Sequence, residues 1–127
     1  MPSSRAVSTW LPVVAWAALI FALSSIPHLG TGLGTWDTLL RKGAHVTEYA
    51  VLALLLVRAI GREAPAFLLG VAYAASDEIH QHFVSGRHSS PIDVAIDSTG
   101  VLLGILVCRA IKQRGIESDR GRAKAIR

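Results

Sequence analysis

The sequence has little cysteine and little charge. Cys108 is the single cysteine, so the chain can form no intramolecular disulfide and no zinc site built on cysteine ligands. Charged residues make up 17% of the chain, which is below the share of about a quarter that is usual for soluble domains. Walker, GxSxG and HExxH motifs are also missing from the sequence, which removes the signatures of P-loop nucleotide hydrolases, serine hydrolases and zinc proteases.

Long apolar runs dominate what is present, since 51% of the 127 residues are hydrophobic. Each run is close to the roughly 20 residues that cross a bilayer as a helix. The four runs span residues 10–26, 44–60, 65–84 and 91–111. We therefore predict an all-α polytopic membrane protein, a bundle of about four transmembrane helices in one domain (1–111) with a tail (112–127).

Two alternatives to this interpretation remain open on the sequence alone. Arg5 before the first run and Ala22-Leu23-Ser24 near its end also fit a cleaved signal peptide. The later runs carry charges near one end, so they also fit the helices of a water-soluble bundle. The membrane interpretation is favoured because the runs lack the alternating apolar and polar faces that soluble helices show.

The basic residues predict an orientation in the membrane. Between Lys112 and Arg127 there are six basic and two acidic residues, which accounts for the whole net charge of +4. Such a tail favours the cytoplasm or anionic lipid headgroups over nucleic acid. With four spans, ten basic residues share the side of the two termini, and three (Arg41, Lys42, Arg87) lie on the other. The positive-inside rule thus predicts that both termini are cytoplasmic.

Ionisable residues gather at the ends of the last three spans. Lys42, His45 and Glu48 open the second span at intervals of three residues, which keeps them on one helix face. The topology brings the end of the third span, the next loop and the start of the fourth span to the same membrane face. These segments contribute Asp77, Glu78, Gln81, Arg87, Asp93 and Asp97. Carboxylates facing lipid at this depth are costly, so we predict a shared polar cavity in the outer half of the membrane.

The residue types in this cavity suggest roles. His45 and Glu48 are candidates for general acid and base, and Asp77 and Glu78 are further catalytic candidates. Structural ion pairing between helices is the simpler alternative for any one of these residues. Substrate-binding roles are predicted for Lys42, Gln81, Arg87, Asp93 and Asp97, because cations suit a phosphate or carboxylate and carboxylates orient those cations.

The sequence identifies no cofactor, and a divalent metal is an alternative use of the same groups. His80 and His82 lie about 200° apart on a helix, so they cannot bind one ion together. Glu78 with His82, joined by His45 or Asp97, is a feasible ligand set.

Gly100 and Gly104 form a GxxxG motif in the fourth span. The motif allows another helix to approach closely, and it is weak evidence for a homo-oligomer.

Four short motifs together resemble the VanZ-like family. They are Lys42-x-x-His45-x-x-Glu48-Tyr49, Ser76-Asp77-Glu78-x-x-Gln81, the following Arg87, and Asp93-x-x-x-Asp97-x-x-Gly100. The resemblance covers roughly residues 37 to 105. It implies a bacterial inner-membrane protein of the cell envelope, from a family named for a component of teicoplanin-resistance gene clusters, and it implies no settled activity. Position 97 departs from the pattern, because the resemblance leads us to expect Asn where this chain has Asp.

The predicted cavity supports two functional hypotheses. In the first, the protein is a membrane enzyme that acts on a lipid-linked or headgroup-bearing envelope substrate. In the second, it is a non-enzymatic binder of a lipid or lipoglycopeptide, or a proton-coupled carrier. A structural subunit of a larger membrane complex is the third alternative. Membrane lipids are the expected partners in each case.

Overall fold

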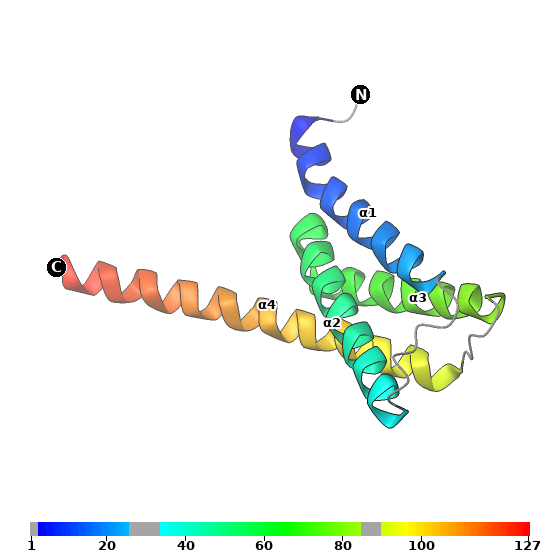
Figure 1. Cartoon of the computed structure of the whole chain (residues 1–127). Coiled ribbons are helices and arrows are strands. Elements are labelled where there is room, and N and C mark those ends of the chain that lie inside the picture. Colours follow the sequence, from blue (N-terminus) through cyan, green and yellow to red (C-terminus); the bar gives the residue numbers. More distant parts are fainter. Residues whose placement is uncertain (1–2, 26–33, 85–89) are drawn as a thin grey trace.

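The computed structural model describes residues 3–25, 34–84 and 90–127. They form four α-helices: α1 (Ser4–Ser24), α2 (Thr35–Ile60), α3 (Glu63–His82) and α4 (Pro91–Ala125) (Figure 1). The all-α prediction is confirmed. Each helix contains one predicted span, apart from residues at two ends: Ser25 follows the end of α1, and Phe83 and Val84 follow the end of α3. Ile26 lies outside the described residues.

Local sequence signals account for where the helices begin and end. The Ser3 hydroxyl caps the start of α1 by accepting a hydrogen bond from the backbone N–H of Ala6 at 3.1 Å. The C-cap of α2 is Gly61, whose φ of 77° is in the left-handed region that favours glycine. Pro91 opens α4, where its missing N–H leaves no hydrogen bond unmade.

Helix α2 contacts all three other helices. Its approach to α4 is very close, because Gly100 and Gly104 of α4 are buried directly against the backbone of α2 at Val46 and Ala50. Gly70 of α3 likewise packs against the side chain of Val101. The GxxxG motif therefore acts within the chain, where it brings two helices together.

An apolar core, buried ionisable side chains and a largely apolar outer surface occur together in the fold. The buried polar side chains are Ser24, Asp77, Glu78, Gln81 and Asp97. Large apolar side chains cover the outside of every helix; Leu11, Leu40, Leu68 and Ile92, for example, are at least 60% exposed. A surface of this kind is stable when lipid surrounds it. The protein is therefore a membrane protein.

Three helices among the described residues, α1, α2 and α4, are long and apolar enough to cross a membrane. The remaining helix, α3, is 20 residues long and ends in the polar segment Ser76–His82. That segment carries two of the buried carboxylates, Asp77 and Glu78. Because lipid cannot solvate such groups, the other helices must shield this end of α3.

The last part of α4 extends well beyond the other three helices (Figure 1). Every residue from Arg109 to the C-terminus is exposed, so the basic tail continues the fourth helix as a solvated extension to Ala125. At the base of this extension Arg109 forms an exposed ion pair with Glu63, and the arginine lowers the pKa of that carboxyl. This pair links the start of α3 to α4.

Candidate functional site

A pair of a half-buried histidine and a buried carboxylate joins α2 to α4. His45 Nδ1 lies 3.2 Å from Asp97 Oδ1, and the exposed fractions of these two side chains are 19% and 2%. The close helix contact explains the pairing. Gly100 is one turn after Asp97 and sits on the backbone of Val46, the residue that follows His45. A larger residue than glycine would hold α4 too far away for this pair to form.

A second pair joins α2 to α3. The Tyr49 hydroxyl donates a hydrogen bond of 3.0 Å to Asp77 Oδ2, and both side chains are buried. Tyr49 lies four residues after His45 and so shares its helix face. One ligand atom from each of His45, Asp77 and Asp97 lies within 4.8 Å of the other two. We refer to His45, Tyr49, Asp77 and Asp97 as the polar centre.

The polar centre contains buried polar atoms that make no hydrogen bond within the described part of the chain. They are Asp77 Oδ1 and Asp97 Oδ2. The side-chain amide nitrogen of Gln81, one turn after Asp77, also makes no hydrogen bond among the described residues. The exposed fractions of these three residues are only 3%, 2% and 4%. Buried polar groups in native proteins nearly always have hydrogen-bond partners. These three atoms are therefore available to a ligand.

Glu78 and Asp93 occupy a separate position beside the polar centre. The Glu78 carboxylate accepts a 2.7 Å hydrogen bond from the backbone N–H of Ser90, and the Ser90 hydroxyl donates to Asp93 Oδ2 at 3.4 Å. These bonds connect the last turns of α3 to the first turn of α4. Their geometry fixes the start of α4, and thereby the position from which Asp97 projects.

Of the remaining predicted site residues, the structure describes Glu48 and Lys42. Glu48 is half-buried one turn after His45, and its backbone carbonyl accepts a 2.8 Å hydrogen bond from Trp16 Nε1. Lys42 is exposed one turn before His45. Arg87 lies outside the described residues.

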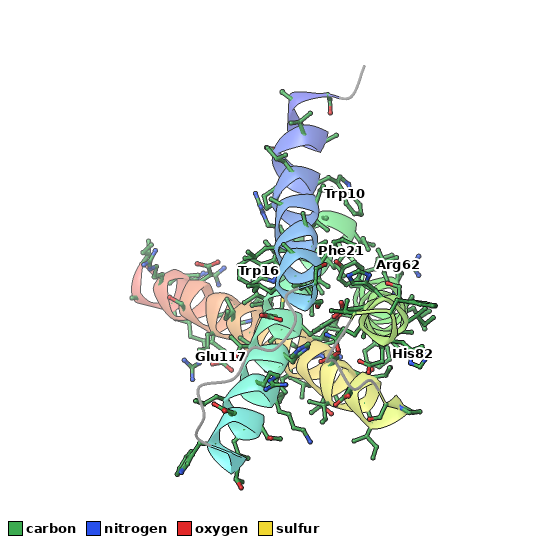
Figure 2. The ribbon with its side chains drawn as sticks, turned by 45° about the vertical axis from the view of Figure 1, so that its right-hand side comes forward. Trp10, Trp16, Phe21, Arg62, His82 and Glu117 are labelled. Atoms are coloured by element: carbon green, nitrogen blue, oxygen red, sulfur yellow. The ribbon has the colours of Figure 1, made fainter. Side chains whose placement is uncertain are left out.

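Helix α1 contributes contacts that the sequence did not suggest. His80 Nε2 is 2.8 Å from the hydroxyl of Ser25, and its ring stacks on Phe21 with centroids 4.2 Å apart. The Tyr73 hydroxyl donates to the backbone carbonyl of Ala17. Phe21 and Trp16 lie along α1 where it meets the other helices (Figure 2). No periodicity in α1 pointed to these bonds, because their partners on the α1 side are a backbone carbonyl and a single serine.

The metal-ligand set considered from the sequence differs from the group that the fold brings together. His82 is exposed at the end of α3 (Figure 2), and Glu78 is bonded to Ser90. Neither belongs to the group formed by His45, Asp77 and Asp97. Asp77 replaces them because it lies on the face of α3 that packs against α2 and α4.

An apolar pocket of about 390 Å³ lies between α1, α2 and α3. Tyr73 connects it to the polar centre, since its ring centroid is 6.2 Å from that of Tyr49. The pocket is lined by Val13, Ala17, Leu52, Leu56, Leu69, Ala72, Tyr73 and Ser76.

The comparison with protein families agrees with this arrangement of helices and motifs. The family model described as VanZ/LLP1 matches residues 3–112. The chain belongs to the VanZ/LLP1 family. Searches of curated proteins and of solved structures found no match. In this VanZ/LLP1 protein the matched region ends where the exposed extension of α4 begins.

Three of the four motifs that suggested the family lie on three different helices of the VanZ/LLP1 protein and meet at one place. His45, Asp77 and Asp97 come from three different motifs, and Gly100 holds two of the helices together. The arrangement provides an imidazole, two buried carboxylates and a phenol beside an apolar pocket.

Proposed function

We propose that this VanZ/LLP1 protein is a membrane enzyme that acts on a lipid-linked or headgroup-bearing molecule of the bacterial cell envelope. The observation that supports this proposal best is the polar centre, which three helices bury next to an apolar pocket. Ligand sites commonly combine apolar walls with a few convergent polar groups. Packing alone does not require buried ionisable groups, because small residues join membrane helices at lower cost.

The polar centre offers the groups that headgroup chemistry needs. Asp97 orients the His45 ring through Nδ1, as a carboxylate orients the imidazole in many acid–base sites. Glu48, one turn along α2, is the second group for proton transfer. Lys42 is exposed one turn before His45, and its cation suits the phosphate or carboxylate of a headgroup. The sequence adds Arg87, between α3 and α4, as a second cation of this kind, and Gln81 supplies a buried amide donor.

The apolar pocket is suited to an acyl chain. Six of its eight lining residues are aliphatic, and the hydroxyls of the other two, Tyr73 and Ser76, are already bonded to backbone carbonyls. A chain in this pocket would place its headgroup toward Tyr49 and the polar centre. We assign the polar centre to the outer half of the inner membrane, with both termini in the cytoplasm, following the distribution of basic residues. We add a role in teicoplanin susceptibility to this proposal because the chain belongs to the VanZ/LLP1 family.

Mass spectrometry of lipids tests this proposal. The reconstituted protein is incubated with total envelope lipids, and the products are compared with those from the Glu48→Gln variant. We expect a modified lipid that falls about 100-fold or more in the variant, because a positioned acid–base group contributes at least that factor. Glu63→Gln, at the exposed Arg109 ion pair, is the matched control and should keep full activity. Equal product from Glu48→Gln and wild type would overturn the assigned chemistry.

A non-enzymatic lipid binder is the second candidate. The observation that favours it is the apolar pocket, in which the polar groups of Tyr73 and Ser76 are already bonded within the chain. In the same experiment a co-purified lipid that stays unmodified supports binding without catalysis. Its loss on Leu56→Trp, which fills the pocket, would separate this lipid from the general lipid shell.

A further inference from the structure

We propose that His45, Asp77 and Asp97 form a binding site for one divalent transition-metal ion. A catalytic role for the bound ion rests on the proposed function. Metal binding itself does not depend on that function. The three residues come from α2, α3 and α4, so an ion at this place would hold three helices together.

The distances suit a metal site. One ligand atom from each residue lies within 4.8 Å of the others. The closest pair, His45 Nδ1 and Asp97 Oδ1, is 3.2 Å apart. Two ligands on a tetrahedral zinc ion, with bonds of about 2.0 Å, are about 3.3 Å apart. This pair already has that separation, and once Nδ1 has lost its proton both atoms can bind an ion in place of their mutual hydrogen bond. The Asp77 oxygen lies within 4.8 Å and has to move closer to complete the set.

Unpartnered carboxylate oxygens provide an independent indication of a ligand. Asp77 Oδ1 and Asp97 Oδ2 make no hydrogen bond among the described residues, although the exposed fractions of the two residues are only 3% and 2%. The other oxygen of Asp77 accepts a hydrogen bond from the Tyr49 hydroxyl, which lies outside the ligand set. Metal-binding carboxylates in proteins are usually oriented by such outer hydrogen bonds.

The charge of the group also fits a divalent ion. Two carboxylates and one neutral imidazole carry a charge of −2, which one divalent ion neutralises. A neutral assembly is the form that a low-dielectric membrane interior accepts most readily. The competing way to reduce this charge is to bind protons, with a cationic His45 and one protonated aspartate, and the experiment below distinguishes the two.

The ligand types narrow the choice of ion. An imidazole nitrogen with two carboxylate oxygens suits zinc or manganese better than calcium or magnesium, which prefer oxygen ligands alone. Three protein ligands leave a coordination position open for water or a substrate oxygen, as in catalytic zinc sites. The buried Gln81 amide, one turn from Asp77, is a donor suited to that bound oxygen.

Metal titration of the purified full-length protein tests the proposal. Protein stripped with EDTA in detergent is titrated with zinc chloride or manganese chloride by calorimetry, and cobalt substitution reports the ligand geometry by its visible absorption. We expect one ion per chain. Asp97→Asn and His45→Ala should each weaken binding at least 10-fold, while His82→Ala, an exposed histidine, should leave it unchanged. Circular dichroism of each variant establishes that it is folded.

The outcomes separate this proposal from the proposed function. Wild-type protein that binds no ion, or binds it as well after His45→Ala, overturns the metal site. If EDTA-stripped protein still modifies lipid at the full rate, the ion has no catalytic role and the enzyme proposal stands without it. If one ion binds at these residues and no lipid is modified, the metal site is supported and the enzyme proposal fails. Where the variant fails to fold, Asp77→Asn, which keeps the size of the side chain, gives the same readout.

Discussion

A methyl group at position 100 of α4 should disturb both the fold and the polar centre. A Cβ on Gly100 would lie 2.5 Å from the carbonyl oxygen of Val46 and 3.0 Å from its Cα. These are backbone atoms of α2, so they cannot rotate away. Carbon–oxygen contacts between packed helices are about 3.3 Å or longer, and Gly100→Ala therefore has to move the two helices apart by about 0.8 Å.

The stability change combines two opposing effects. Overpacking costs about 1–3 kcal/mol, whereas alanine is favoured over glycine inside a helix by about 1 kcal/mol. Gly43→Ala isolates the second effect, because Gly43 is also helical and its added Cβ would meet no atom within 4 Å. We expect the free energy of unfolding of Gly100→Ala to be about 1–3 kcal/mol lower than that of Gly43→Ala. A detergent titration followed by circular dichroism measures this difference.

The separation should also break the link between α2 and α4 at the polar centre. The His45–Asp97 distance of 3.2 Å has little room to increase before the hydrogen bond is lost. Gly100→Ala should thus lower metal affinity as well as stability. The Cβ added by Gly104→Ala would meet the backbone of Ala50, one turn further along α2 than Val46. We expect this substitution to lower stability more than metal affinity. If Gly100→Ala and Gly43→Ala have the same stability and affinity, the packing argument is refuted.

Two further substitutions test single bonds. Tyr49→Phe removes the donor to Asp77 and leaves a buried carboxylate with no hydrogen bond from the described residues, so we expect a loss of about 1–3 kcal/mol in detergent unfolding; unchanged stability would contradict this. The pKa of Glu63 is lowered by Arg109, so the ion pair stabilises the fold above the usual glutamate pKa of 4.5 and this contribution is lost as the pH falls through the lowered value. The effect is small because the pair is exposed, and comparing the melting temperatures of wild type and Glu63→Gln across this pH range measures it.

The number of helices and the gathering of polar residues could be predicted from the sequence. Apolar runs of bilayer length give the helices, and alternating span directions place the start of α2, the end of α3 and the start of α4 together. His45, Asp77 and Asp97 follow from this logic, because each lies toward the end of its helix that this arrangement brings together.

The pairings within the site could not be predicted, because they depend on how each helix is rotated about its axis. Intervals within α2 suggested Glu48 as the partner of His45, yet the structure pairs His45 with Asp97 of another helix. Gly100 contained the missing information, but a GxxxG motif does not reveal whether its partner is in the same chain or in another. The bond of Glu78 to Ser90 was equally hidden, since backbone N–H groups leave no trace in a sequence.

Asp97, where the resemblance leads us to expect Asn, decides the charge of the site. With Asn at this position, the group of His45, Asp77 and residue 97 would carry one carboxylate, which a cationic His45 balances without any ion. With Asp it carries two, and one oxygen of each remains without a partner in the described chain. The second carboxylate thus raises the charge that must be neutralised from one to two, and makes a divalent ion a better match than a single proton. Asp97→Asn should accordingly convert the centre from one that prefers a metal ion to one that is satisfied by protonation of His45.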